Sequence, residues 1–380
     1  MKSILTLLMA FATAACLAGP RARDLGVPFD GQPGPLNAIT DVAGVTVGHT
    51  TLVADLPDGR KVRTGVTAIL PRGRDSFATP VFGGWHSLNG NGEMTGTTWL
   101  EESGELEGPV MITNTHSVGV VRDAVIAWRV RMAGPDTTGY WWSLPVVAET
   151  FDGHLNDING FHVNPGHATA ALESAAGGPV AEGSVGGGTG MICHEFKCGI
   201  GTSSRQVAIA DRTHTVGVLV QANYGLREQL RIAGVPVGEN IREHRAYQDQ
   251  RDETGSIIIV VATDAPLLPH QLKRIVRRAG MGLARMGSVA GNGSGDIFVS
   301  FSTANAQAIA SDSYAAAEFL DNGSLSPLFE ATVQATEEAI VNALVAAKDM
   351  QGQDGRYAIA LPHDRLVELL KRYNRWSPPR

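Results

Sequence analysis

The run Ile257-Ile258-Ile259-Val260-Val261 constrains the fold of this 380-residue chain more than its other segments do. All five residues are β-branched, and such residues are enriched in strands. A strand that is apolar on both sides belongs to a sheet whose two faces are both covered. Layers of helix on either side of a central sheet, or of a pair of sheets, meet this requirement.

Apolar periodicity predicts further strands and helices after residue 63, whereas residues 19–63 are rich in turns. The expected strands are 64–70, 109–115, 191–199, 205–210, 214–222, 256–263 and 296–302. The expected helices are 118–132, 166–175, 269–286, 325–347 and 363–374. The helix at 269–286 carries one apolar stripe, while the helix at 325–347 is apolar on several sides and is expected to be well buried.

Residues 1–18 are typical of an export signal. Lys2 precedes an apolar run at 4–15, which is too short to span a bilayer. We expect cleavage after Ala18 and a periplasmic mature protein. A lipid-anchored form is disfavoured, because Thr13 stands where lipoprotein signals usually carry Leu, Val or Ile. No later stretch is apolar and long enough to predict a membrane span.

Charge and metal-ligating residues exclude several function classes. The chain has 31 basic and 38 acidic residues, with no basic block that could follow a phosphate backbone, so nucleic acid is not an expected partner. Its 11 histidines form no H-E-x-x-H pair. We therefore expect no metal and no cofactor.

Cys193 and Cys198 lie in the expected strand 191–199, where an odd spacing puts them on opposite faces. In an extended strand they are roughly 16 Å apart, which is beyond disulfide reach. The adjacent His194 does not complete a zinc site. The spacing predicts two ordinary half-buried cysteines.

The junction Gly255-Ser256 is the candidate for chemistry. The charged segment 239–254 ends there, and the most apolar strand begins with a hydroxyl residue. Glycine adopts backbone angles forbidden to other residues, and the following hydroxyl could attack the preceding carbonyl. Cleavage would free the α-amine of Ser256, whose reference pKa near 7.7–8.0 suits a base at neutral pH. The alternative, on local features, is a serine that only caps a turn.

Longer segments give the junction its context. They are RARDLGVPFDGQPGPLNAITDVAGVTVGHT (21–50), LPVVAETFDGHLNDING (144–160), GGPVAEGSVGGGTGM (177–191), KCGIGTSSR (197–205), TVGVLVQANYG (215–225), GSIIIVVATDAPLLPHQLKRIVRRA (255–279), GSGDIFVSFST (293–303) and VQATEEAIVNALVAA (333–347). On these segments the chain resembles the DmpA/BapA-like family of L-aminopeptidase/D-amino-acid esterases and β-peptidyl aminopeptidases. This family consists of self-processing serine peptidases of the N-terminal-nucleophile type.

The resemblance implies an α+β fold, a four-layer αββα sandwich related to that of ornithine acetyltransferases. It implies that the precursor, a single domain over residues 19–380, cuts itself between Gly255 and Ser256. The products are an α-chain of residues 19–255 and a β-chain of residues 256–380. The resemblance also implies a homotetramer of processed αβ units.

Site residues are carried over from matching positions. Ser256 resembles the nucleophile, and Ser294 and Asp296 match the Ser-Gly-acidic motif near it. Asn223 resembles the oxyanion-hole side chain, and Glu149 resembles the group that receives the substrate's amine. Alternation places Ser294 and Asp296 on one strand face. Whether the Ser256 amine or Ser294 takes the proton stays open at this point.

Two positions depart from the family pattern. Phe151 stands in the substrate pocket where one branch carries Tyr and another carries Leu, and Phe has no hydrogen-bond donor. Asp296 stands where the β-peptidyl branch has Glu. Substrate choice among L-, D- and β-amino acids is therefore not fixed by the resemblance.

The resulting expectation is a serine aminopeptidase that removes N-terminal residues from short peptides, amino-acid amides or esters. The reaction would proceed through an acyl-enzyme on Ser256. One alternative is an acyltransferase of the ornithine-acetyltransferase type, although those enzymes use Thr and are cytoplasmic. The other is a non-catalytic periplasmic binding protein on the same scaffold.

Overall fold

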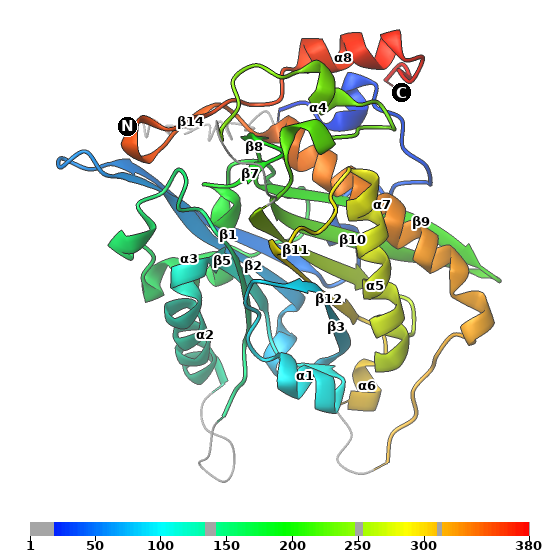
Figure 1. Cartoon of the computed structure of the whole chain (residues 1–380). Helices are drawn as coiled ribbons and strands as arrows, with labels where there is room; N and C mark the ends of the chain where they lie inside the picture. Colours follow the sequence, from blue (N-terminus) through cyan, green and yellow to red (C-terminus); the bar gives the residue numbers. More distant parts are fainter. Residues whose placement is uncertain (1–18, 134–141, 248–253, 310–313, 380) are drawn as a thin grey trace, which may run out of the picture.

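The computed structural model describes residues 19–133, 142–247, 254–309 and 314–379 (Figure 1). The expected export signal, residues 1–18, lies outside these residues. Among the described segments, no helix is long and apolar enough to cross a membrane.

Two sheets form the centre of the molecule. The larger has six strands in the order β4-β3-β12-β11-β10-β9, and the smaller has four in the order β1-β2-β5-β6. The strands of the larger sheet are β3 (Val81–Gly90), β4 (Glu105–Leu106), β9 (Ile200–Ile209), β10 (Arg212–Asn223), β11 (Thr254–Thr263) and β12 (Gly293–Ser302). The strands of the smaller sheet are β1 (Thr46–Asp55), β2 (Lys61–Arg74), β5 (Val110–Asn114) and β6 (Val146–Thr150). Two short hairpins are β7 (Ile192–Cys193) with β8 (Phe196–Lys197), and β13 (Met350–Gln351) with β14 (Tyr357–Ala358).

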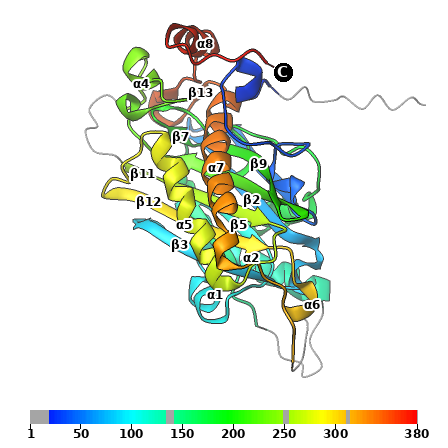
Figure 2. The same cartoon turned by 90° about the vertical axis from the view of Figure 1, so that its right-hand side faces the viewer.

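Helices cover the outer face of each sheet. Figure 2 shows α5 and α7 side by side over the larger sheet, while α2 and α3 pack against the smaller one (Figures 1 and 2). The α-helices are α1 (Thr97–Ser103), α2 (Val118–Ala133), α3 (Pro165–Glu173), α4 (Val237–Asn240), α5 (Pro269–Arg285), α6 (Ala306–Ile309), α7 (Ser326–Ala346) and α8 (His363–Arg372).

Three apolar layers hold these elements together. One lies between the larger sheet and α5 and α7, a second lies between the two sheets, and a third lies between the smaller sheet and α2 and α3. The predicted four-layer αββα sandwich is confirmed.

The apolar run in β11 serves two of these layers at once. Ile257, Ile259 and Val261 belong to the layer under α5 and α7, while Ile258 and Val260 belong to the layer between the sheets. Alternating side chains of one strand thus face opposite sides. This arrangement is the reason for the lack of a polar position in the run.

Helix α7 is the buried helix that the sequence predicts, with apolar residues on several sides. It approaches β9 so closely that a Cβ on Gly201 would lie 2.0 Å from the carbonyl oxygen of Ala339. Only glycine fits at this contact.

The prediction for residues 191–199 is wrong. The segment is not one strand but the hairpin β7–β8, which reverses at His194 and Glu195, both with positive φ (47° and 59°). Since the chain turns back, Cys193 and Cys198 do not lie on opposite faces of a strand. Both are fully buried free thiols, and burial together with hydrogen bonding to Cys198 raises the pKa of Cys193.

Candidate active site

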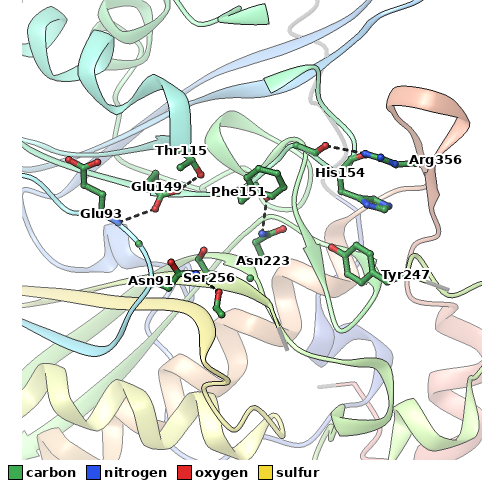
Figure 3. Close-up of a pocket in the computed structure, with 14 residues that line it drawn as sticks. Asn91, Glu93, Thr115, Glu149, Phe151, His154, Asn223, Tyr247, Ser256 and Arg356 are labelled. Carbon is green, nitrogen blue, oxygen red and sulfur yellow. Dashed lines mark hydrogen bonds between the residues drawn. The ribbon is translucent and has the colours of Figure 1, made fainter. Parts of the chain in front are cut away.

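A pocket of about 810 Å³ opens at the end of the inter-sheet layer, where β6, β10, β11 and β12 terminate or begin (Figure 3). It brings together Ser256, Asn223, Glu149 and Phe151, which are far apart in the sequence. Its lining residues are Asn91, Gly92, Glu93, Thr115, Glu149, Phe151, Gly153, His154, Asn223, Tyr247, Gly255, Ser256, Gly293 and Arg356.

Both residues of the Gly255-Ser256 bond line this pocket. Gly255 has φ +149°, and a Cβ there would lie 2.2 Å from the carbonyl oxygen of Asn223, so the position accepts only glycine. Ser256 pairs with Asn223 across the antiparallel strands β10 and β11, and it is 4% exposed. Directly opposed residues point to the same face of a sheet, so the Ser256 hydroxyl and the Asn223 amide share the pocket.

The Asn223 side chain is fixed by two backbone groups. Its Oδ1 accepts a hydrogen bond from Ile192 N (2.9 Å), and its Nδ2 donates to the carbonyl oxygen of Phe151 (2.9 Å). These partners define which end is the amide nitrogen. An amide nitrogen carries two hydrogens, so one N–H remains for a group in the pocket.

Glu149 is the last-but-one residue of β6 and is 3% exposed. Its Oε1 accepts from the backbone N of Glu93 (3.0 Å), and its Oε2 accepts from the Thr115 hydroxyl. Burial raises the pKa of Glu149, and these two hydrogen bonds oppose that rise. A desolvated carboxylate held in this way is suited to binding a cation that brings its own donors.

Ser294 and Asp296 lie on β12, beside β11. Their side chains are hydrogen-bonded (Ser294 Oγ to Asp296 Oδ1, 2.7 Å) and fully buried, as the alternating spacing predicts. They do not line the pocket. Gly255 lies opposite Ser294 in the parallel pair, so strand alternation turns Ser294 toward the helix-covered face and Ser256 toward the inter-sheet face.

Phe151 and Asp152 have different surroundings although they are adjacent. Phe151 lines the pocket with its side chain 49% exposed. Asp152 is fully buried and accepts from Asn156 Nδ2 at 3.0 Å. Burial raises the pKa of Asp152 from 3.8 to about 7.

The raised pKa of Asp152 predicts that the free energy of unfolding depends on pH. The folded protein holds the Asp152 proton up to about pH 7, whereas the unfolded chain releases it near pH 4, so the free energy of unfolding falls as pH rises between these values. The full loss is on the order of 4 kcal/mol. Asp152→Asn does not titrate. We therefore expect the wild type to lose stability relative to this variant between pH 4 and pH 8 in urea titrations.

The matched control is Asp123→Asn, at an exposed position of α2. It makes the same chemical change at a carboxyl group that is 80% exposed. A stability difference between wild type and Asp152→Asn that stays constant from pH 4 to pH 8 would contradict the raised pKa.

The described residues contain no group of three or more His, Cys, Asp or Glu placed to hold a metal ion. The polar groups that line the pocket are amides, hydroxyls and two carboxylates, together with the His154 imidazole and the Arg356 guanidinium. They are suited to acid–base and nucleophilic chemistry on an organic substrate.

Comparison with known proteins places the chain. A family model for peptidase family S58 matches residues 37–358. The chain belongs to peptidase family S58. The β-peptidyl aminopeptidase BapA of Sphingosinicella microcystinivorans is 54% identical to this S58 chain over 385 residues, covering 97% of it and 96% of BapA.

Solved structures agree with this placement. The L-aminopeptidase D-Ala-esterase/amidase of Ochrobactrum anthropi, a prototype of the serine aminopeptidases with a variant Ntn hydrolase fold, has a TM-score of 0.89 and 48% identity. The match covers 94% of the S58 chain and 100% of the Ochrobactrum anthropi chain. A β-aminopeptidase of Burkholderia sp. has a TM-score of 0.85 and 49% identity, covering 93% and 99%. The S58 chain is thus a hydrolase with the Ntn-type fold, and its expected aminopeptidase activity is confirmed.

Sequence reasoning missed the residues that hold the expected site residues in place. Thr115 and the backbone of Glu93 fix Glu149, while Ile192 fixes Asn223. His154, Tyr247 and Arg356 also line the pocket. No local motif marks these six residues, because tertiary contacts bring them to the site from separate segments of the chain.

Proposed function

We propose that this S58 peptidase cuts itself between Gly255 and Ser256 and then uses Ser256 as the nucleophile of an aminopeptidase. The products are an α-chain of residues 19–255 and a β-chain of residues 256–380. The observation that carries the proposal is that both sides of this bond line the same pocket as Glu149 and Asn223.

The local geometry supports self-cleavage. The Ser256 hydroxyl attacks the Gly255 carbonyl carbon, the Gly255–Ser256 C–N bond breaks, and an ester links Gly255 to Ser256 Oγ. Water then hydrolyses the ester, leaving a carboxylate on Gly255 and both a hydroxyl and a free α-amine on Ser256. The absence of a Cβ at Gly255, where one would collide with Asn223, leaves the carbonyl carbon accessible.

Turnover reuses these groups. Glu149 receives the substrate's ammonium group, and the remaining N–H of Asn223 stabilises the oxyanion that forms when Ser256 attacks. The Ser256 amine is the base, with a reference pKa near 7.7–8.0. Ser294 lies beside Gly255 and Asp296 beside Ile257, so the hydrogen-bonded pair flanks Ser256 from behind the strand, and we assign it the role of positioning that amine.

The substrates we propose are short peptides, amino-acid amides or esters with a free amine on an L-, D- or β-amino acid. This class is supported by the relatives named above, which are a β-peptidyl aminopeptidase and an L-aminopeptidase D-Ala-esterase/amidase. The half-exposed Phe151 gives the pocket an apolar wall that has no hydroxyl donor.

We also propose that residues 1–18 direct export to the periplasm. Lys2 followed by the apolar run 4–15 supports this proposal. A homotetramer of processed αβ units is proposed on the family resemblance.

Labelling with a sulfonyl fluoride tests the nucleophile. We expect one equivalent of inhibitor on Ser256 and a proportional loss of activity, because the pocket activates this hydroxyl alone. Tryptic peptides separate Ser256 from Ser294, since Lys273 and Arg285 lie between them. Inactivation with the label on Ser294 or elsewhere would contradict the assignment.

A further inference from the structure

The active-site pocket continues into a second hollow of about 500 Å³. The two share His154, Tyr247 and Arg356 as lining residues. The rings of His154 and Tyr247 meet edge to face at 4.7 Å between centroids and form a wall at the junction. In Figure 3, Glu149 and Arg356 lie at opposite ends of the site, with Ser256, Asn223 and Phe151 between them.

The two ends of this groove differ in charge, and at the Arg356 end Asp354 also lines the second hollow, 3.9 Å from the guanidinium. Glu93 and Glu149 lie at one end, and the Arg356 guanidinium lies at the other. His154 is neutral at physiological pH, because burial, with a smaller contribution from Arg356, lowers its pKa to about 4. Arg245 lines the second hollow but is engaged by Glu195 at 2.6 Å and by Glu228 at 3.1 Å.

The Arg356 guanidinium is held in place by hydrogen bonds from one of its nitrogens. Its Nη1 donates to the carbonyl oxygens of Gly153 and His154, both at 3.3 Å. Its Nη2 forms a loose ion pair with Asp354 Oδ2 at 3.9 Å, without a hydrogen bond, so a substrate carboxylate would replace this partly exposed carboxylate. The side chain is 44% exposed. A guanidinium anchored through one nitrogen can present its other donors to a carboxylate in a forked arrangement.

We propose that Arg356 binds the terminal carboxylate of the residue that leaves after cleavage, so that the enzyme prefers free dipeptides to their C-terminal amides. The inference rests on the proposed function. With the substrate's amine on Glu149 and its carbonyl at Ser256, the leaving residue extends toward Arg356. The groove then matches a zwitterion at both ends.

Paired substrates test this preference. The probes are L-Ala-L-Ala, D-Ala-L-Ala and β-Ala-L-Ala, each as the free acid and as the C-terminal amide, assayed for kcat/KM. We expect the wild type to prefer the free acids by about tenfold or more, which is typical of a hydrogen-bonded charged pair. In Arg356→Gln the acid-to-amide ratio should fall to about 1, mainly through KM, while Arg356→Lys keeps part of the preference.

The matched control is Arg212→Gln, which removes the same charge. Arg212 is the first residue of β10, whose last residue is Asn223 in the pocket, so it lies at the far end of that strand. Its acid-to-amide ratio should equal that of the wild type.

Two results would overturn the proposal. One is a wild-type ratio near 1, and the other is an equal loss on acids and amides in Arg356→Gln, which would indicate a structural role through the Gly153 and His154 carbonyls. Failure of the proposed function is distinguishable, because the wild type would then cleave neither member of any pair, and this outcome overturns both.

Discussion

Ser256→Ala leaves a single uncut chain with no aminopeptidase turnover. The substitution removes the hydroxyl that attacks the Gly255 carbonyl, and it also removes the nucleophile for substrate. Loss of a serine nucleophile reduces kcat on the order of 10⁶-fold in a well-studied protease. Alanine keeps the Cβ in a nearly buried strand position and leaves the pairing of β11 with β10 intact, so the variant folds.

Gel electrophoresis and a peptide-amide assay measure both effects. The matched control is Ser324→Ala, because Gly323-Ser324 is a second Gly-Ser pair that lies in a short 3₁₀ turn away from the pocket. That variant should be processed and active. Turnover by Ser256→Ala at more than a trace of the wild-type rate would refute the proposed nucleophile.

Glu149→Gln should retain self-cleavage and lose most turnover of substrates with a free amine. Glutamine has nearly the shape of glutamate, its oxygen can accept from the backbone N of Glu93, and its amide can donate to the Thr115 hydroxyl. The fold is therefore preserved while the negative charge is lost. Removing one partner of a desolvated charge pair costs about 2–5 kcal/mol. We expect kcat/KM to fall on the order of 100- to 1,000-fold.

Measuring both self-cleavage and kcat/KM separates a loss of substrate binding from a general loss of the active site. The uncut precursor presents no free amine at the scissile bond, so its cleavage does not require Glu149. Glu102→Gln, at an exposed position of α1, serves as the control with the same chemical change and should have wild-type kinetics. Undiminished kcat/KM in Glu149→Gln would show that the substrate's amine binds elsewhere.

Much of the architecture was predictable, because the apolar pattern in β11 and α7 is strong. The expected strand 214–222 is β10 within a few residues, and the helix 269–286 is α5. The pattern failed where local signals are weak. β3 contains three glycines, which disfavour strands, and β6 has only five residues.

The hairpin at 191–199 shows a different limit. Its turn has positive φ at His194 and Glu195 rather than at a glycine. The sequence therefore contains no residue typical of a hairpin turn at this point. The side chains do alternate as in a strand, but the chain reverses its direction in the middle of the segment. The two cysteines consequently lie in one buried cluster rather than on opposite faces.

The candidate site was only partly predictable for a related reason. Ser256 is marked by its own context, a charged segment followed by a buried strand. The orientation of Ser294 and Asp296 behind β11 depends on register between strands, which the sequence does not show. Arg356 gives no local signal, because it reaches the pocket from the loop between β13 and β14.

Intact-mass spectrometry of the purified protein, with N-terminal sequencing, tests the central claim most directly. We expect two fragments, one of which begins at Ser256 and ends at Arg380, with a total mass one water above that of the uncut mature chain. A single uncut chain that hydrolyses peptide amides would contradict it, because the Ser256 amine would never have been freed.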